Sequence, residues 1–142
     1  MSVQKILVAT DGSESAGRAV TFAAELARAT GAAVVAVHVF EPLALLGEVA
    51  PPVDFAASEA RARTELHETW CAPLIAADVT FTAEVIEGAP AAAIVSLARD
   101  HNVDLIVVGA RGHSRLGELL IGSTSSGVLH HAPVPVTVVP SP

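Results

Sequence analysis

The chain has 142 residues, 51% of them hydrophobic, which is enough for one domain with a substantial core. Its formal net charge of −7 argues against non-specific binding to nucleic acids or anionic membranes, since both need clustered basic residues. A single cysteine excludes an internal disulfide, and no apolar run approaches the length of a spanning helix. We therefore expect one cytoplasmic domain over residues 1–142, with no membrane or nucleic-acid partner.

Apolar and amphipathic segments alternate along the first half of the chain. Residues 5–10 form a short, continuous apolar run followed by turn residues, which is typical of a buried strand. Alanine and valine at helical spacing predict a helix over 14–30, and 33–40 is a second buried strand. Residues 41–53 hold three prolines and one glycine and predict a long loop. Residues 54–70 predict an amphipathic helix that ends before the next proline.

The second half continues the alternation. Residues 79–87 predict a strand, 90–102 a helix with proline in its first turn, and 103–109 another strand. A short helix over about 122–132 and a strand over 136–139 complete the chain. Strict alternation with right-handed crossovers predicts an α/β fold with an open, doubly wound, Rossmann-like parallel sheet and helices on both faces.

Ligands of such sheets bind at the carboxyl ends of the strands, where the strand order reverses. This rule points to the chain just after the first, second and fourth predicted strands, at Asp11, Val39 and Gly109. The last of these positions begins the most unusual stretch of the chain, GARGHSRLGELLIGSTSSG, which contains five glycines in residues 109–127.

The glycine spacing excludes two common phosphate-binding motifs. A Walker loop needs Gly-Lys-Ser/Thr, and the only lysine is Lys5. The G-x-G-x-x-G fingerprint of dinucleotide-binding proteins is absent as well. What remains is Gly109-x-x-Gly112, nine residues, and then Gly122-Ser123.

This spacing can form a phosphate site. Gly109 and Gly112 would leave bare backbone for a ligand, and Gly122 would open a helix whose N-terminal N–H groups suit phosphate. The same stretch contains hydroxyl groups that could donate hydrogen bonds and basic side chains that could neutralise a polyphosphate. The hydroxyls are those of Ser123, Thr124 and Ser125, and the basic side chains are those of Arg111, His113 and Arg115. On the residues alone, a surface loop followed by an ordinary serine N-cap explains the stretch equally well.

The chain resembles the universal stress protein family over almost its whole length. The first strand, turn and helix, KILVATDGSESAGRAVTFAAELA, and the whole C-terminal half carry the resemblance. The spacing of Gly109, Gly112, Gly122 and Ser123 is similar to that of the ATP-binding branch. The resemblance implies a five-stranded sheet in the order 3-2-1-4-5, bound ATP, and Mg²⁺ or Mn²⁺ held through the phosphates.

The resemblance also implies a role for each residue of the pocket. The nucleoside would lie at the ends of three strands, against Ala9, Thr10, Asp11, Val39, Val108 and Gly109. The phosphates would lie against backbone and hydroxyls near the last helix, at Gly112, Gly122, Ser123, Thr124 and Ser125. Val39 would contact adenine through its backbone, and Asp11 would lie near the ribose and the metal.

In function, the resemblance implies a nucleotide-responsive homodimer that acts in stress response or growth arrest by binding ATP. No obvious general base accompanies the motif apart from Asp11 or His113, so we expect no more than weak ATPase activity. The alternatives are a slow ATP hydrolase and an interaction module that binds no nucleotide. The dimer would pair the strand Val136 to Val139 with its twin; a covered edge in a monomer is the alternative.

Other residues have structural explanations. Asp11 or Ser13 can cap the first helix, and His38 and Cys71 are expected to be packing residues. We expect no site in which histidines hold a metal. Gly127 lowers the stability of the last helix by about 1 kcal/mol relative to alanine, and the sequence offers no function for it.

Overall fold

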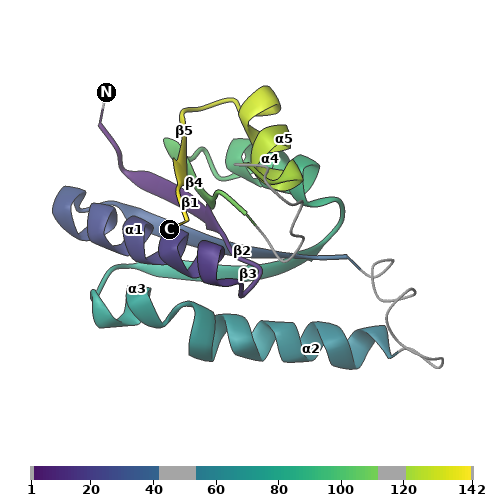
Figure 1. Ribbon diagram of the computed structural model, residues 1–142. Coiled ribbons are helices and arrows are strands. Elements are labelled where there is room, and N and C mark those ends of the chain that lie inside the picture. Colours follow the sequence, from purple (N-terminus) through teal and green to yellow (C-terminus); the bar gives the residue numbers. More distant parts are fainter. Residues whose placement is uncertain (1, 42–53, 112–120, 142) are drawn as a thin grey trace.

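Five parallel strands form a single sheet in the order β3-β2-β1-β4-β5, as predicted (Figure 1). The structure, a computed structural model, describes residues 2–41, 54–111 and 121–141. The strands are β1 (Lys5–Ala9), β2 (Ala33–Phe40), β3 (Phe81–Glu87), β4 (Leu105–Gly109) and β5 (Val136–Val139). Because β1 lies between β2 and β4, the strand order reverses at the centre of the sheet.

Helices cover both faces of the sheet (Figure 1). The helical segments are α1 (Glu14–Thr30), α2 (Phe55–Glu65), a π-helical turn (Leu66–Trp70), α3 (Ala72–Ala76), α4 (Pro90–Asp100) and α5 (Ser123–His131). The first four lie on one face, and α4 and α5 lie on the other. No helix of the described residues is long and apolar enough to cross a membrane.

The core divides into two layers because successive side chains of a strand point to opposite faces. On β1, Ile6 and Val8 pack beneath α1, whereas Leu7 packs beneath α4 and α5. All three side chains are fully buried. A strand buried on both faces must be apolar throughout, which is why the central strands read as continuous hydrophobic runs.

The predicted single helix over 54–70 was only partly correct. The α-helix ends at Glu65, a π-helical turn follows, and the short helix α3 then begins one residue before Pro73. Proline is tolerated in a first helical turn because no intrahelical partner is needed for a backbone N–H there. Pro73 therefore lies within a new helix, which the sequence analysis missed.

Ser13, and not Asp11, caps α1. The Ser13 hydroxyl accepts a hydrogen bond from the backbone N–H of Ala16 at 3.2 Å. The Asp11 carboxylate instead accepts one from the backbone N–H of Ser13 at 2.9 Å, which orders the turn before the helix. The alternative left open by the sequence is thereby resolved in favour of Ser13.

Cys71 is a packing residue, as expected. Its side chain is fully buried in the layer beneath α1. Burial raises the pKa of the Cys71 thiol to about 11, so the thiol stays neutral near pH 7. A neutral, buried thiol is a poor nucleophile, because the thiolate is the reactive form.

Gly127 allows α4 and α5 to approach closely. A Cβ atom on Gly127 would lie 2.7 Å from the Cβ of Ala91, which is closer than two carbon atoms can pack. The contact between the two helices therefore explains a glycine that the helix itself disfavours.

We expect Gly127→Ala to destabilise the protein by about 1–2 kcal/mol, because overpacking outweighs the gain in helix propensity. Urea unfolding measures the change. Ala91→Gly removes the methyl group that would clash. In the Ala91→Gly variant, Gly127→Ala should therefore lower the free energy of unfolding by less than it does in the wild type. A single variant as stable as the wild type would contradict the packing explanation.

Candidate functional site

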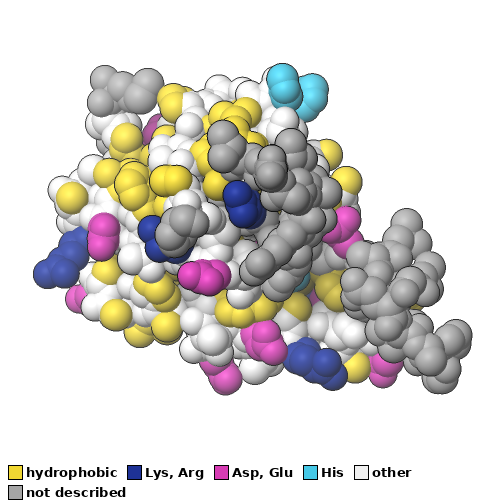
Figure 2. Space-filling view, in the orientation of Figure 1, with side chains coloured by type: hydrophobic (Ala, Val, Ile, Leu, Met, Phe, Trp, Pro, Cys, Tyr) yellow, Lys and Arg dark blue, Asp and Glu magenta, His cyan; other side chains and the backbone are white. Residues whose placement is uncertain are grey.

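A pocket of about 920 Å³ opens at the carboxyl ends of β1, β2 and β4, within the usual volume range of small-molecule sites. It lies at the point where the strand order reverses, as the topology predicts. Figure 2 shows basic and acidic side chains interspersed over the described part of one face, without a large patch of one charge.

The turn after β1 forms one wall of the pocket. Thr10 is buried, its backbone N–H donates to Val37 O at 2.9 Å, and its hydroxyl accepts a hydrogen bond from the N–H of Gly12. The ring of His38 lies behind this turn, with Nδ1 2.9 Å from the carbonyl oxygen of Thr10. Because a carbonyl can only accept, Nδ1 carries the proton in this contact. These contacts hold Asp11, the next residue, at the edge of the pocket.

The end of β4 is packed against the first turn of α1. A Cβ atom on Gly109 would lie 2.6 Å from both the carbonyl oxygen and the hydroxyl of Ser15. The Ser15 hydroxyl in turn accepts a hydrogen bond from the backbone N–H of Arg111 at 3.0 Å. The space beside the Gly109 Cα is thus filled by α1, and this contact is the structural reason for the glycine. The sequence analysis had instead attributed the glycine to room for a ligand.

The hydroxyl of Ser125 is engaged within the protein. It donates to the carbonyl oxygen of Gly109 at 2.5 Å, and the Ser125 side chain is buried. A serine hydroxyl has one proton, so this contact ties α5 to β4 and leaves Ser125 without a side-chain proton for a ligand. Ser123 and Thr124, which also line the pocket, have no such bond to another described residue.

The N-terminus of α5 faces the pocket without a side-chain cap. Gly122 is the N-cap residue, and its own backbone N–H donates to Ala110 O at 2.6 Å. The N–H groups of the first helical turn have no partners within the helix, and they carry the positive end of the helix dipole. By contrast, the N-terminus of α1 is closed by Ser13. The N-terminal N–H groups of α5 are therefore suited to bind an anionic group.

Most of the predicted site residues come together in this one pocket. The structure places eleven of them in its lining: Ala9, Thr10, Asp11, Val39, Val108, Gly109, Arg111, Gly122, Ser123, Thr124 and Ser125. Three further predicted residues, Gly112, His113 and Arg115, lie outside the described residues. Segments separated by some hundred residues in the chain thus contribute to the same site because their strand ends are adjacent in the sheet.

The sequence analysis missed the wall that α2 contributes. Ser58, Arg61 and Ala62 line the pocket from one face of α2, and Trp70 lines it from the π-helical turn. Their spacing of three and four residues was the available signal, because such residues share one helix face. Arg61 has no ion pair with another described residue, whereas Arg63 pairs with Glu59 at 3.1 Å. Arg61 on α2 and Arg111 just after β4 both bring positive charge to the lining of the pocket.

The described residues contain no group of three or more histidine, cysteine or acidic side chains that could hold a metal by themselves. The pocket does offer hard oxygen donors, namely the carboxylate of Asp11 and the hydroxyls of Ser123 and Thr124. Such a sparse oxygen set fits Mg²⁺ or Mn²⁺ bound largely through ligand phosphates, which is how Mg²⁺ commonly binds.

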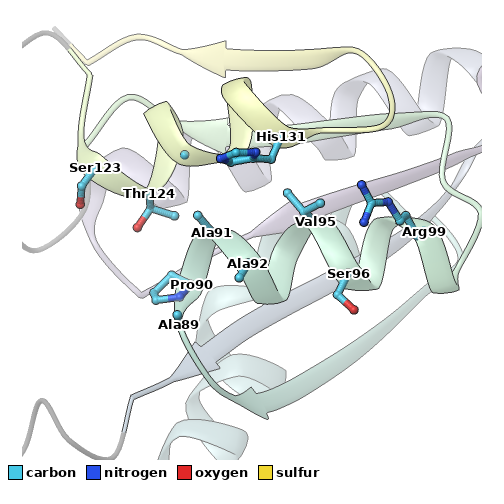
Figure 3. Close-up of a pocket in the computed structure, with 11 residues that line it drawn as sticks. Ala89, Pro90, Ala91, Ala92, Val95, Ser96, Arg99, Ser123, Thr124 and His131 are labelled. Atoms are coloured by element: carbon cyan, nitrogen blue, oxygen red, sulfur yellow. The ribbon is translucent and has the colours of Figure 1, made fainter.

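A smaller groove of about 650 Å³ runs between α4 and α5 (Figure 3). It shares Pro90, Ser123 and Thr124 with the larger pocket, so the two hollows meet at the first turn of α5. Figure 3 shows Val95 and Arg99 on the side of α4 that faces His131. The close contact between Gly127 and Ala91 lies within this groove.

The fold and the pocket define a class of protein: a doubly wound α/β domain with a pocket at the strand ends, beside a helix whose N-cap residue provides no side-chain cap. Residues 2–140 match the model of the universal stress protein family. The chain belongs to this family, as the sequence resemblance predicted.

Relatives and solved structures agree with this assignment. A universal stress protein of Thermus aquaticus is 38% identical over 137 residues, covering 94% of this chain and 96% of the relative. The universal stress protein UspA from Lactobacillus plantarum superposes with a TM-score of 0.81 at 28% identity, covering 98% of this chain and 99% of the other. A universal stress protein in complex with cAMP superposes with a TM-score of 0.73 at 28% identity, covering 98% of both chains.

Proposed function

We propose that the protein binds ATP and acts as a nucleotide-responsive homodimer in stress response or growth arrest. The observation that carries this proposal is the uncapped N-terminus of α5, which opens into a pocket already lined by two arginines. Together they provide the N–H donors, the hydroxyls and the positive charge that a polyphosphate needs. The cAMP complex of a related structure supports a nucleotide as the class of ligand.

The two ends of the pocket suit the two ends of a nucleotide. The phosphates would lie at the α5 N-terminus, beside Ser123, Thr124 and Arg111, and the Asp11 carboxylate would help to hold Mg²⁺ or Mn²⁺. The adenosine would lie at the ends of β1 and β2, where the lining residues include Ala9 and Val39. A bound divalent ion would offset negative charge on the phosphates.

The proposed mode of action is binding and not turnover. Efficient hydrolysis needs a base that orients water toward the γ-phosphate. The Asp11 carboxylate already accepts a hydrogen bond from the Ser13 N–H, which holds it in the turn before α1. A slow hydrolase on the same scaffold is the alternative, and it would show itself as steady phosphate release.

Calorimetric titration of the purified protein with ATP and Mg²⁺ tests the proposal directly, and mass analysis of ligand released from freshly purified protein identifies what it carries. Saturable ATP binding with negligible phosphate release is the expected result. No heat of binding at millimolar ATP would favour an interaction module without a nucleotide. Release of many phosphates per minute would instead favour the hydrolase.

The proposed dimer would form at β5. This strand lies at the edge of the sheet and, within the part of the chain that the structure describes, is paired with β4 alone; all four of its residues are partly exposed (Figure 1). The N–H of Ala110 donates to Val139 O, so alternate residues of β5 bond to β4 while the N–H of Val138 faces outward.

We expect Val138→Pro to convert the dimer to a monomer, because proline removes an outward donor and is tolerated on an edge strand. Sedimentation velocity of the wild type and the variant measures the change. Circular dichroism confirms that the sheet persists. A wild type that sediments as a monomer, or a variant that remains a dimer, would contradict pairing through β5.

A further inference from the structure

Trp70 is the only tryptophan of the chain, and it lines the pocket together with Thr10, Asp11 and His38. We infer that Trp70 is a ligand-binding residue whose indole contacts the nucleoside part of the bound nucleotide. The inference rests on the proposed nucleotide-binding function and adds to it a contact from the α2 side of the pocket.

The π-helical turn directs Trp70 into the pocket. The backbone N–H of Cys71 donates to Leu66 O at 3.0 Å, which closes a turn one residue wider than that of an α-helix. Leu66, at the start of this turn, is fully buried in the core, while Trp70, at its end, borders the pocket. Such wide turns are rare, and they often occur at functional sites. Figure 1 shows the junction of α2 and α3 beneath the first turn of α1.

Gly12 provides the space that the indole occupies. Its φ of 80° is a backbone conformation that favours glycine, and a Cβ atom there would lie 2.5 Å from Cε2 of Trp70 and 2.8 Å from its Nε1. The indole is also held edge-to-face by the His38 ring, with the centroids 5.1 Å apart. The turn after β1 and the His38 side chain thus position Trp70 before any ligand arrives.

The indole offers two kinds of contact. Its ring can pack against a base or a ribose, and its N–H can donate to a ligand oxygen. Among the described residues the indole N–H makes no hydrogen bond, and every buried side-chain polar atom of those residues has a partner. The Trp70 N–H is therefore accessible to solvent, at a residue that borders the pocket.

The position of Trp70 within the pocket selects the nucleoside as the group it contacts. Trp70 lies against Gly12, next to Asp11, at the β1 and β2 side of the pocket. The uncapped helix and the hydroxyls of Ser123 and Thr124 form a separate, anion-binding side on α5. A nucleotide bound with its phosphates at α5 therefore presents its nucleoside to the indole.

Intrinsic fluorescence tests the contact, because the chain has one tryptophan and no tyrosine. Titration with ATP and with adenosine should change the Trp70 emission, while tripolyphosphate, which lacks the nucleoside, should leave it unchanged. An emission unchanged by ATP that calorimetry shows to be bound would overturn the inference, as would an equal response to tripolyphosphate.

Two variants of Trp70 test by calorimetry how much its side chain contributes to the affinity for ATP and adenosine. Trp70→Ala should weaken ATP and adenosine binding about tenfold or more, and Trp70→Phe, which keeps an aromatic ring but loses the N–H, should weaken both by less. Phe22→Ala is the matched control, since Phe22 is an exposed aromatic residue on α1 outside the pocket lining. If Trp70→Ala does not fold, the affinity of Trp70→Phe still tests the contact with the nucleoside.

The outcomes separate this inference from the proposed function. Wild-type affinity in both Trp70 variants would refute the nucleoside contact and leave ATP binding intact. A wild-type protein that binds neither ATP nor adenosine would refute both.

Discussion

Gly122→Val is expected to abolish ATP binding while the protein stays folded. The substitution places a branched side chain at the N-cap of α5, where the phosphates would approach the helix N–H groups. The backbone of Gly122 has φ −73° and ψ 168°, an extended conformation that valine adopts readily. Steric exclusion of the phosphates should weaken binding by at least about two orders of magnitude, since the N-terminal anion contacts would be lost together.

Calorimetry with ATP and Mg²⁺ measures this loss, and circular dichroism with thermal melting confirms the fold. Gly17→Val is the matched control, because Gly17 lies within α1 and has nothing within 4 Å of the position of an added Cβ. The control should bind ATP like the wild type. Unchanged affinity in Gly122→Val itself would show that the phosphates do not approach α5.

The largest stability effect is expected at Gly109. Gly109→Ala should destabilise the protein by about 2–3 kcal/mol, because the new methyl group would overlap the backbone of Ser15. A side chain could rotate away, but a carbonyl within the first turn of α1 cannot. Relief would require α1 to move away from β4, which would strain the hydrogen bond between the Arg111 N–H and the Ser15 hydroxyl.

Urea unfolding of Gly109→Ala and Gly17→Ala provides the comparison. Gly17→Ala makes the same chemical change in open space within a helix, so it should leave stability unchanged or raise it by up to about 1 kcal/mol. The midpoint of thermal unfolding of Gly109→Ala should fall by about 5–10 °C. Equal stabilities of Gly109→Ala and the wild type would mean that α1 and β4 are not in tight contact.

Substitutions at the two glycines are expected to have different effects, one on ligand affinity and the other on the stability of the fold. Gly122 lines the pocket, and its substitution is expected to act on affinity. Gly109 lies at the packing side, between α1 and α5, and its substitution is expected to act first on stability. The absence of a side chain is thus expected to admit a ligand at Gly122, whereas at Gly109 it accommodates a neighbouring helix.

The sheet and most of the pocket were predictable from sequence. Alternating apolar and amphipathic segments encode a parallel sheet locally, since each strand must be apolar on both faces and each helix on one. In a parallel sheet all carboxyl ends meet at one edge. For this reason Asp11, Val39 and Gly109, chosen only because each lies at or near the carboxyl end of a strand, line the same pocket.

Contacts between segments distant in the chain could not be predicted in this way. The sequence alone determined the order of strands and helices, the resemblance to a family, and the edge of the sheet where a ligand would bind. Only the tertiary structure decided that Gly109 accommodates Ser15, that Gly127 accommodates Ala91, and that Gly12 accommodates the indole of Trp70. The periodicity of apolar residues in the sequence indicates which face of a helix or strand is buried. The distance between two backbones depends on how the side chains of the helices pack against the sheet.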